Sequence, residues 1–275
     1  MNILVTNDDG CDSPLLIPFL DALKLESWAK QITPVIPDQE QSWISSAMHR
    51  FKPIKATKRL FGVHEGYALD GFPSDCTSIG ISNLGSSPFD MVLSGINFGI
   101  NAGLPFYLCS GTVGGAVQGF LLGLPSIAIS AHVPREFWPL KNENPKLLFS
   151  EYHAEWKNIA LASARTVRKI IQAKAHKECD LISINIPWNA SADAEIVVTE
   201  IERGAFKQIF RKIDEDVYLH RITDEDVIIE AQSDTSLAGD LHTVVGGKIS
   251  VTPVRYNLTH RQLEVISKFK KAFGG

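Results

Sequence analysis

The sequence lacks the features of a membrane, secreted or disulfide-linked protein. No apolar run approaches the ~20 residues that cross a bilayer, and the adjacent acids Asp8 and Asp9 interrupt the apolar start that a signal peptide would need. Its few cysteines are scattered without CxxC spacing, which is typical of reduced thiols: Cys11, Cys76, Cys109 and Cys179. These absences predict a cytoplasmic protein with no membrane association.

Other absences exclude three functional classes. The net charge is -4 with no basic block, which argues against a groove for a nucleic-acid polymer. The eight histidines show no HExxH spacing, so a zinc hydrolase with that motif is not indicated. No GxGxxG follows the first apolar run, so the pyrophosphate-binding turn of a dinucleotide-dependent oxidoreductase is missing.

Apolar runs alternate with helix-like segments over the first 190 residues. Buried strands are predicted at 3–6, 32–36, 90–93, 127–130 and 181–186, with hairpin material at 51–70. Helices are predicted at 13–30, 73–83, 110–122 and 151–174, and a proline-rich linker at 134–145. This rhythm favours an α/β fold with a Rossmann-like, mostly parallel sheet flanked by helices.

The sequence changes character after residue 190. Residues 195–232 alternate like strands joined by charged turns, and 259–273 has the pattern of a last helix. We therefore predict a core domain, 1–190, that binds metal and phosphate, and a smaller C-terminal β-hairpin and helix extension, 191–275. The extension is predicted to serve oligomerisation, and the two parts can also form one continuous domain.

The first ten residues, MNILVTNDDG, carry the strongest local signal. A buried strand leads directly into Asp8, Asp9 and Gly10. Ligands of open α/β sheets bind beyond the carboxyl ends of the strands, and two carboxylates with no adjacent base suit Mg²⁺ or Mn²⁺. The alternative is an acidic turn in which an aspartate caps the following helix.

Three further polar clusters follow other predicted strands or open a helix. They are 38–42, ending at Ser42; 94–101, containing Asn97 and Asn101; and Ser110-Gly111-Thr112. Each cluster taken alone is typical of a turn or of a helix N-cap. Together at one sheet edge they form a sparse, all-oxygen metal site beside a helix N-terminus that can hold phosphate.

Six segments occur in the order typical of one known family. They are TNDDG (6–10), PDQEQS (37–42), GFPSDC (71–76), LSGINFGIN (93–101), SGTVGGA (110–116) and SVTP (250–253). The sequence resembles the SurE family, the survival-protein 5′/3′-nucleotidases. This resemblance extends over nearly the whole chain.

The resemblance implies a divalent-metal-dependent phosphatase of nucleoside 5′-monophosphates, with 3′-monophosphates and short polyphosphate as further substrates. It implies one Mg²⁺ or Mn²⁺ per subunit, a homodimer or homotetramer, and these metal ligands: Asp8, Asp9, Ser42 and Asn97. Further matches line the phosphate pocket: Asn101, Ser110, Gly111 and Thr112. Asp8 and Asp9 are the expected catalytic residues. Asp8 is the favoured base for the attacking water, and an aspartyl-phosphate intermediate is the alternative.

The second motif departs from the family pattern Pro-Asp-Arg-x-Arg-Ser-Gly. Gln39 and Gln41 replace the arginines, which weakens the attraction for phosphorylated substrates, and Trp43 replaces the glycine. Trp43 is placed to stack on a base or to narrow the entrance. A non-catalytic metal- and nucleotide-binding sensor of the same fold is the alternative function, and the intact ligand set favours the enzyme.

Overall fold

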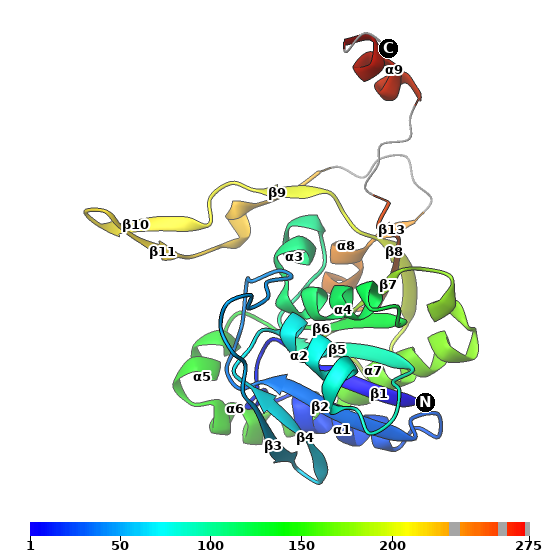
Figure 1. The fold of residues 1–275 in the computed structure, drawn as a ribbon. Helices are drawn as coiled ribbons and strands as arrows, with labels where there is room; N and C mark the ends of the chain where they lie inside the picture. Colours follow the sequence, from blue (N-terminus) through cyan, green and yellow to red (C-terminus); the bar gives the residue numbers. More distant parts are fainter. Residues whose placement is uncertain (231–236, 258–262, 273–275) are drawn as a thin grey trace.

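A ten-stranded sheet forms the centre of the computed structural model, which describes residues 1–230, 237–257 and 263–272 (Figure 1). In spatial order its strands are β13 (Ala238–Gly239), β8 (Ile196–Glu200), β14 (Ile249–Val254), β7 (Leu181–Pro187), β6 (Ser126–His132), β5 (Met91–Phe98), β1 (Asn2–Thr6), β2 (Gln31–Pro37), β4 (His64–Leu69) and β3 (Ala56–Phe61). Neighbours are parallel except at β7–β14 and β3–β4. The predicted α/β fold with a mostly parallel sheet is confirmed.

Helices cover both faces of this sheet. One face packs against α1 (Leu16–Lys24) and α7 (His153–Gln172), and the other against α2 (Pro73–Ile79) and α4 (Gly111–Leu121). The remaining helices are α3 (Leu104–Cys109), α5 (Phe137–Glu143), α6 (Pro145–Glu151), α8 (Asp240–Val245) and α9 (Leu263–Ala272), with short turns η1 (Gly80–Leu84), η2 (Ala175–Lys177) and η3 (Asp224–Asp226). None of the helices in the described ranges is long and apolar enough to span a membrane.

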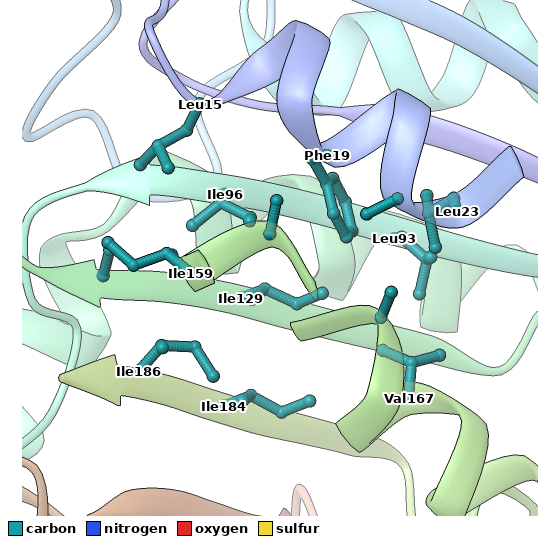
Figure 2. Packing of buried hydrophobic residues seen from close by; sticks show 14 of the residues in the cluster. Leu15, Phe19, Leu23, Leu93, Ile96, Ile129, Ile159, Val167, Ile184 and Ile186 are labelled. Atoms are coloured by element: carbon teal, nitrogen blue, oxygen red, sulfur yellow. The ribbon is translucent and has the colours of Figure 1, made fainter. Parts of the chain in front are cut away.

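Successive side chains of a strand point to opposite faces of the sheet, so each strand contributes apolar residues to both buried faces. In β1, Ile3 and Val5 join the cluster under α1 and α7, whereas Leu4 faces the opposite cluster. Figure 2 shows Phe19 of α1 packed over strand residues such as Ile129. Full burial of each such side chain stabilises the fold by roughly 1.5–3 kcal/mol.

The functional edge of the sheet follows from the order of its strands. β1 pairs with β2 on one side and with β5 on the other. After β1 the chain adds β2 on one side of it, and later adds β5 on the other side. The position between β1 and β5, where the direction of strand addition reverses, is a topological switch point. Ligands of open α/β sheets bind at the carboxyl ends of the strands beside such a point.

Three predicted boundaries were wrong. The helix expected at 13–30 spans only Leu16–Lys24, because Ser13 lies in a turn whose carbonyl accepts from the Leu16 N–H at 3.2 Å. The strand expected at 90–93 continues to Phe98. The linker expected at 134–145 contains α5, because Pro139 falls in its first turn, where no N–H is needed.

Residues after 190 contribute to two structures. β8, β13 and β14 extend the main sheet, whereas β10 (Phe210–Asp214) and β11 (Val217–His220) form an antiparallel hairpin that projects from the body (Figure 1). β9 (Gly204–Phe206) pairs with β12 (Val227–Ile229) at its base. The hairpin exposes Phe210, Ile213, Val217, Tyr218 and Leu219. The predicted last helix corresponds to α9, and 258–262 and 273–275 lie outside the described residues.

A glycine of α4 lets the loop after β2 pack against that helix. A Cβ atom on Gly114 would lie 2.1 Å from the backbone oxygen of Ser45. Gly114→Ala is therefore expected to lower the free energy of unfolding by about 1–3 kcal/mol, as overpacking does, although alanine has the higher helix propensity. Urea unfolding measures this, with Gln118→Ala in the same helix as the control. An unchanged midpoint for Gly114→Ala would show that this loop does not pack as described.

Candidate active site

The turn after β1 fixes the two aspartates at the switch point. The Asn7 side chain closes this turn, because its Oδ1 accepts from the Gly10 N–H at 3.0 Å and its Nδ2 donates to the Gly10 carbonyl at 3.2 Å. Gly10 has φ +81°, and a Cβ there would lie 2.7 Å from the backbone of Gln39. Only glycine fits this position without strain. The turn leaves Asp8 and Asp9 3% and 6% exposed.

Each aspartate is held by groups far away in the sequence. The Asp9 carboxylate accepts from the Phe98 N–H at 2.5 Å, and its other oxygen lies 2.7 Å from the Lys141 ammonium. The Thr112 hydroxyl donates to the Asp8 carboxylate. Segments after β1, at the end of β5 and at the start of α4 therefore meet at the two acids.

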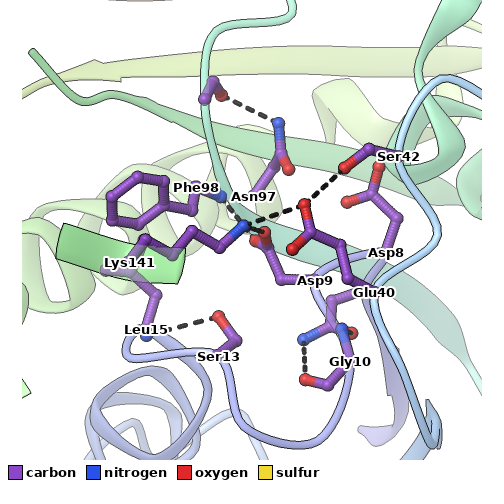
Figure 3. A network of polar contacts seen from close by, with 12 residues as sticks. Asp8, Asp9, Gly10, Ser13, Leu15, Glu40, Ser42, Asn97, Phe98 and Lys141 are labelled. Atoms are coloured by element: carbon purple, nitrogen blue, oxygen red, sulfur yellow. Dashed lines mark hydrogen bonds and ion pairs between the residues drawn. The ribbon is translucent and has the colours of Figure 1, made fainter. Parts of the chain in front are cut away.

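Lys141 of α5 joins this site to the loop after β2 (Figure 3). Its ammonium lies 3.1 Å from Glu40 Oε1, and the Ser42 hydroxyl donates to the same carboxylate at 2.8 Å. The Lys141 side chain is only 9% exposed, and its ammonium lies 5.0 Å from the centre of the Phe98 ring. An aromatic face stabilises such a buried cation.

Asn97 lies near the end of β5, on the far side of the aspartates from α1. Its Nδ2 donates to the Gly99 carbonyl at 2.9 Å. This bond turns the side-chain oxygen toward the Asp8 and Ser42 side of the cluster, as Figure 3 shows. Figure 3 shows Asp8, Asp9, Ser42 and Asn97 in one cluster of side chains, and their binding of a metal stays a prediction.

The start of α4 borders the same cluster. The Ser110 hydroxyl caps the helix by accepting from the Val113 N–H at 3.0 Å, which was the alternative reading of this residue, and its contact with phosphate stays a prediction. A Cβ on Gly111 would lie 2.9 Å from the Asp8 Cβ atom, so only a glycine lets the helix approach the acids this closely. Free N–H groups at a helix N-terminus favour an anion such as phosphate.

Asn101 is hydrogen-bonded to two strands of the sheet rather than to the aspartates. Its Nδ2 donates to the Ser130 hydroxyl at 2.7 Å, and its N–H donates to Asn185 Oδ1 at 3.0 Å. These bonds tie the segment between β5 and α3 to β6 and β7. Contact of Asn101 with phosphate stays a prediction.

The charges of the cluster suit a divalent cation. Burial, and then the neighbouring Asp9, raise the pKa of Asp8 to about 7, and a cation beside the pair would favour its ionised form. Within the described ranges no three His, Cys, Asp or Glu side chains converge on a metal position. The predicted donor set, two carboxylates with a hydroxyl and an amide oxygen, is one that Mg²⁺ accepts because it retains several waters.

Comparison with known proteins identifies the family. The family described as "Survival protein SurE" matches residues 3–208. A protein named 5′-nucleotidase SurE from Methanocaldococcus jannaschii is 32% identical, covering 100% of this chain and 98% of that protein. Another of that name from Methanosarcina acetivorans is 31% identical, covering 94% and 93%. The chain belongs to the SurE family.

A solved SurE structure agrees with this assignment. The crystal structure of the SurE protein from Aquifex aeolicus superposes with a TM-score of 0.70 at 26% identity, covering 99% of each chain. The six motifs on which the resemblance rested therefore identified the family correctly. The match also extends through the residues after 190, where the SVTP motif forms part of β14.

Two residues that contact the cluster, Glu40 and Lys141, were not predicted from the sequence. Glu40 stands inside the PDQEQS motif and was visible there as a third acid two residues before Ser42. Lys141 carries no local signal, because its segment was predicted to be a linker and it lies 132 positions from Asp9. Only the tertiary fold brings this ammonium to the aspartates.

Proposed function

We propose that this SurE protein hydrolyses nucleoside 5′-monophosphates to nucleoside and phosphate with one divalent cation, Mg²⁺ or Mn²⁺. The convergence of the Asp8–Asp9 pair with Ser42 and Asn97 at the first turn of α4 carries this proposal. The name 5′-nucleotidase, borne by relatives that align over the whole chain, supports the substrate class. 3′-Monophosphates and short polyphosphate are the further substrates that we propose to test.

The protein's own residues account for substrate positioning. Asp8, Asp9, Ser42 and Asn97 would hold the cation, which polarises a phosphoryl oxygen and activates a water when bound. The first turn of α4, from Ser110 to Thr112, would hold the phosphoryl oxygens with its N–H groups and hydroxyl. Lys141, set between Asp9 and Glu40, keeps both carboxylates in place and supplies positive charge that Gln39 and Gln41 do not.

The projecting hairpin supports the proposed homodimer or homotetramer. β10 and β11 expose five large apolar side chains away from the body, and exposed apolar surface of this kind is typical of contacts between protein chains. The partner we propose is a second copy of this chain.

Phosphate release from a panel of esters tests the function. The panel contains 5′- and 3′-nucleoside monophosphates, p-nitrophenyl phosphate and short polyphosphate, each with Mg²⁺, Mn²⁺ or EDTA. We expect turnover of 5′-monophosphates with metal, none in EDTA, and recovery when excess Mg²⁺ is added back. Release that persists in EDTA after dialysis would contradict the metal-dependent mechanism.

The same panel separates the enzyme from a sensor. If calorimetry detects binding of both metal and a nucleoside monophosphate, but no ester is hydrolysed, the protein is a sensor of the same fold. If neither binds, the assignment of the site to Asp8, Asp9, Ser42 and Asn97 is wrong.

A further inference from the structure

Trp43 is held in a conformation that a tryptophan rarely adopts. Its φ is +60°, in the left-handed region that favours glycine. Backbone strain of this kind persists only where the surrounding structure enforces it, and it concentrates at functional sites. Trp43 is also 37% exposed, so burial of its ring does not explain its presence.

The loop that carries Trp43 is fixed on both sides. The Gln41 N–H donates to the Asp8 carbonyl at 2.6 Å, and the Ser45 N–H donates to the Cys109 carbonyl at 3.0 Å. The first bond ties the loop to the aspartates and the second to the residue before the α4 cap. The backbone of Trp43 therefore stands at a defined position beside Ser42, in a loop anchored to Asp8 at one end and to the residue before the α4 cap at the other.

Three aromatic rings from other segments pack against the indole, two of them edge-to-face and one tilted. We call Trp43, Phe106, Phe206 and His220 the aromatic cluster. The ring centroids lie 6.1, 5.4 and 4.5 Å from that of Trp43, with interplanar angles of 65°, 46° and 60°. The cluster therefore orients the indole while Trp43 keeps 37% of its surface exposed.

We propose that Trp43 is the base-binding residue of this protein, receiving the nucleobase of a nucleoside monophosphate by stacking while its phosphate lies at the start of α4. This inference rests on the proposed function and deepens it. An exposed, oriented aromatic ring is the group on which bases stack with little dependence on their identity. It follows that the protein prefers nucleotides over small phosphate esters but discriminates weakly among bases.

Steady-state kinetics on two esters test the role of Trp43. Adenosine 5′-monophosphate and ribose 5-phosphate share the phosphate and sugar, and only the first has a base. For Trp43→Gly we expect the ratio of their kcat/KM values to fall roughly 5- to 150-fold, the range for loss of one stacked base. The change should lie in KM for the nucleotide. Trp43→Phe, which keeps an aromatic ring, should recover most of the ratio.

Phe51→Gly is the matched control, because Phe51 is a 90% exposed aromatic of the same loop outside the cluster. It should leave the ratio unchanged. An equal loss of both activities in Trp43→Gly would overturn the proposal, since Trp43 would then only position the Ser42 loop. An unchanged ratio would also overturn it, because the base would bind elsewhere.

Calorimetric titration separates this proposal from the proposed function. If the wild-type protein hydrolyses neither ester, the phosphatase assignment fails, but titration with adenosine 5′-monophosphate still measures stacking. Weaker binding to Trp43→Gly than to wild type, with equal binding of inorganic phosphate, would support base binding by a non-catalytic protein. Equal nucleotide affinities of the two proteins would overturn it.

Discussion

Asp9→Asn should lower metal-dependent phosphate release by at least about 10³-fold, the scale seen when a central catalytic group is removed. Asparagine keeps the shape of the side chain and an oxygen for the Phe98 N–H, which donates to Asp9 at 2.5 Å. It removes the negative charge that a divalent cation requires. The expected defect is therefore loss of metal affinity in a folded protein, measured by phosphate release together with calorimetric titration of Mn²⁺.

Asp12→Asn is the control for this experiment. Asp12 lies three residues further along the chain, its side chain is 86% exposed, and it pairs with Arg59 at 3.2 Å. It should retain both activity and metal affinity. Wild-type turnover by Asp9→Asn would exclude Asp9 as a metal ligand, and loss of activity with unchanged Mn²⁺ affinity would assign it a role other than binding the cation.

Lys141→Met should destabilise the metal-free protein by about 3–5 kcal/mol, because breaking a buried ion pair leaves an uncompensated charge. The Lys141 ammonium is the group that neutralises Asp9, at 2.7 Å, inside a site that already raises the pKa of Asp8 to about 7. The melting temperature should fall by roughly 10 °C in EDTA. Differential scanning calorimetry measures this change.

The same variant tests the link between the lysine and the cation. A bound divalent ion would restore the missing positive charge, so saturating Mg²⁺ should raise the melting temperature more in Lys141→Met than in wild type. Lys52→Met serves as the control, because Lys52 forms an exposed pair with Asp70 and such pairs contribute about 0–1 kcal/mol. If Mg²⁺ raises the melting temperature equally in Lys141→Met and in wild type, the lysine and the metal do not neutralise the same carboxylates.

The parts of the site that sequence predicted are those with a local cause. Asp8 and Asp9 follow directly from a buried strand, and Ser110 precedes a helical pattern as a cap. In each case residues close by in the sequence determine the position of the side chain. The carboxyl ends of parallel strands then place these groups at one edge.

The parts that sequence did not predict depend on distant contacts. The length of β5 to Phe98 follows from its pairing with β6, and the role of α5 follows from the contact of Lys141 with Asp9. Likewise β14 joins the sheet by pairing with β7 and β8, segments separated from it by about fifty residues or more. Neither hydrophobic period nor turn chemistry encodes such partners.

The central place of β1 in the sheet has a consequence for how the protein is made. β1 leaves the ribosome before β5, yet one of its two edges waits for β5, which ends at Phe98. Nascent chains shorter than this present an apolar strand with an unpaired edge, and such edges template aggregation. Asp8 and Asp9, the proposed catalytic acids, are therefore synthesised before the strand that completes their surroundings.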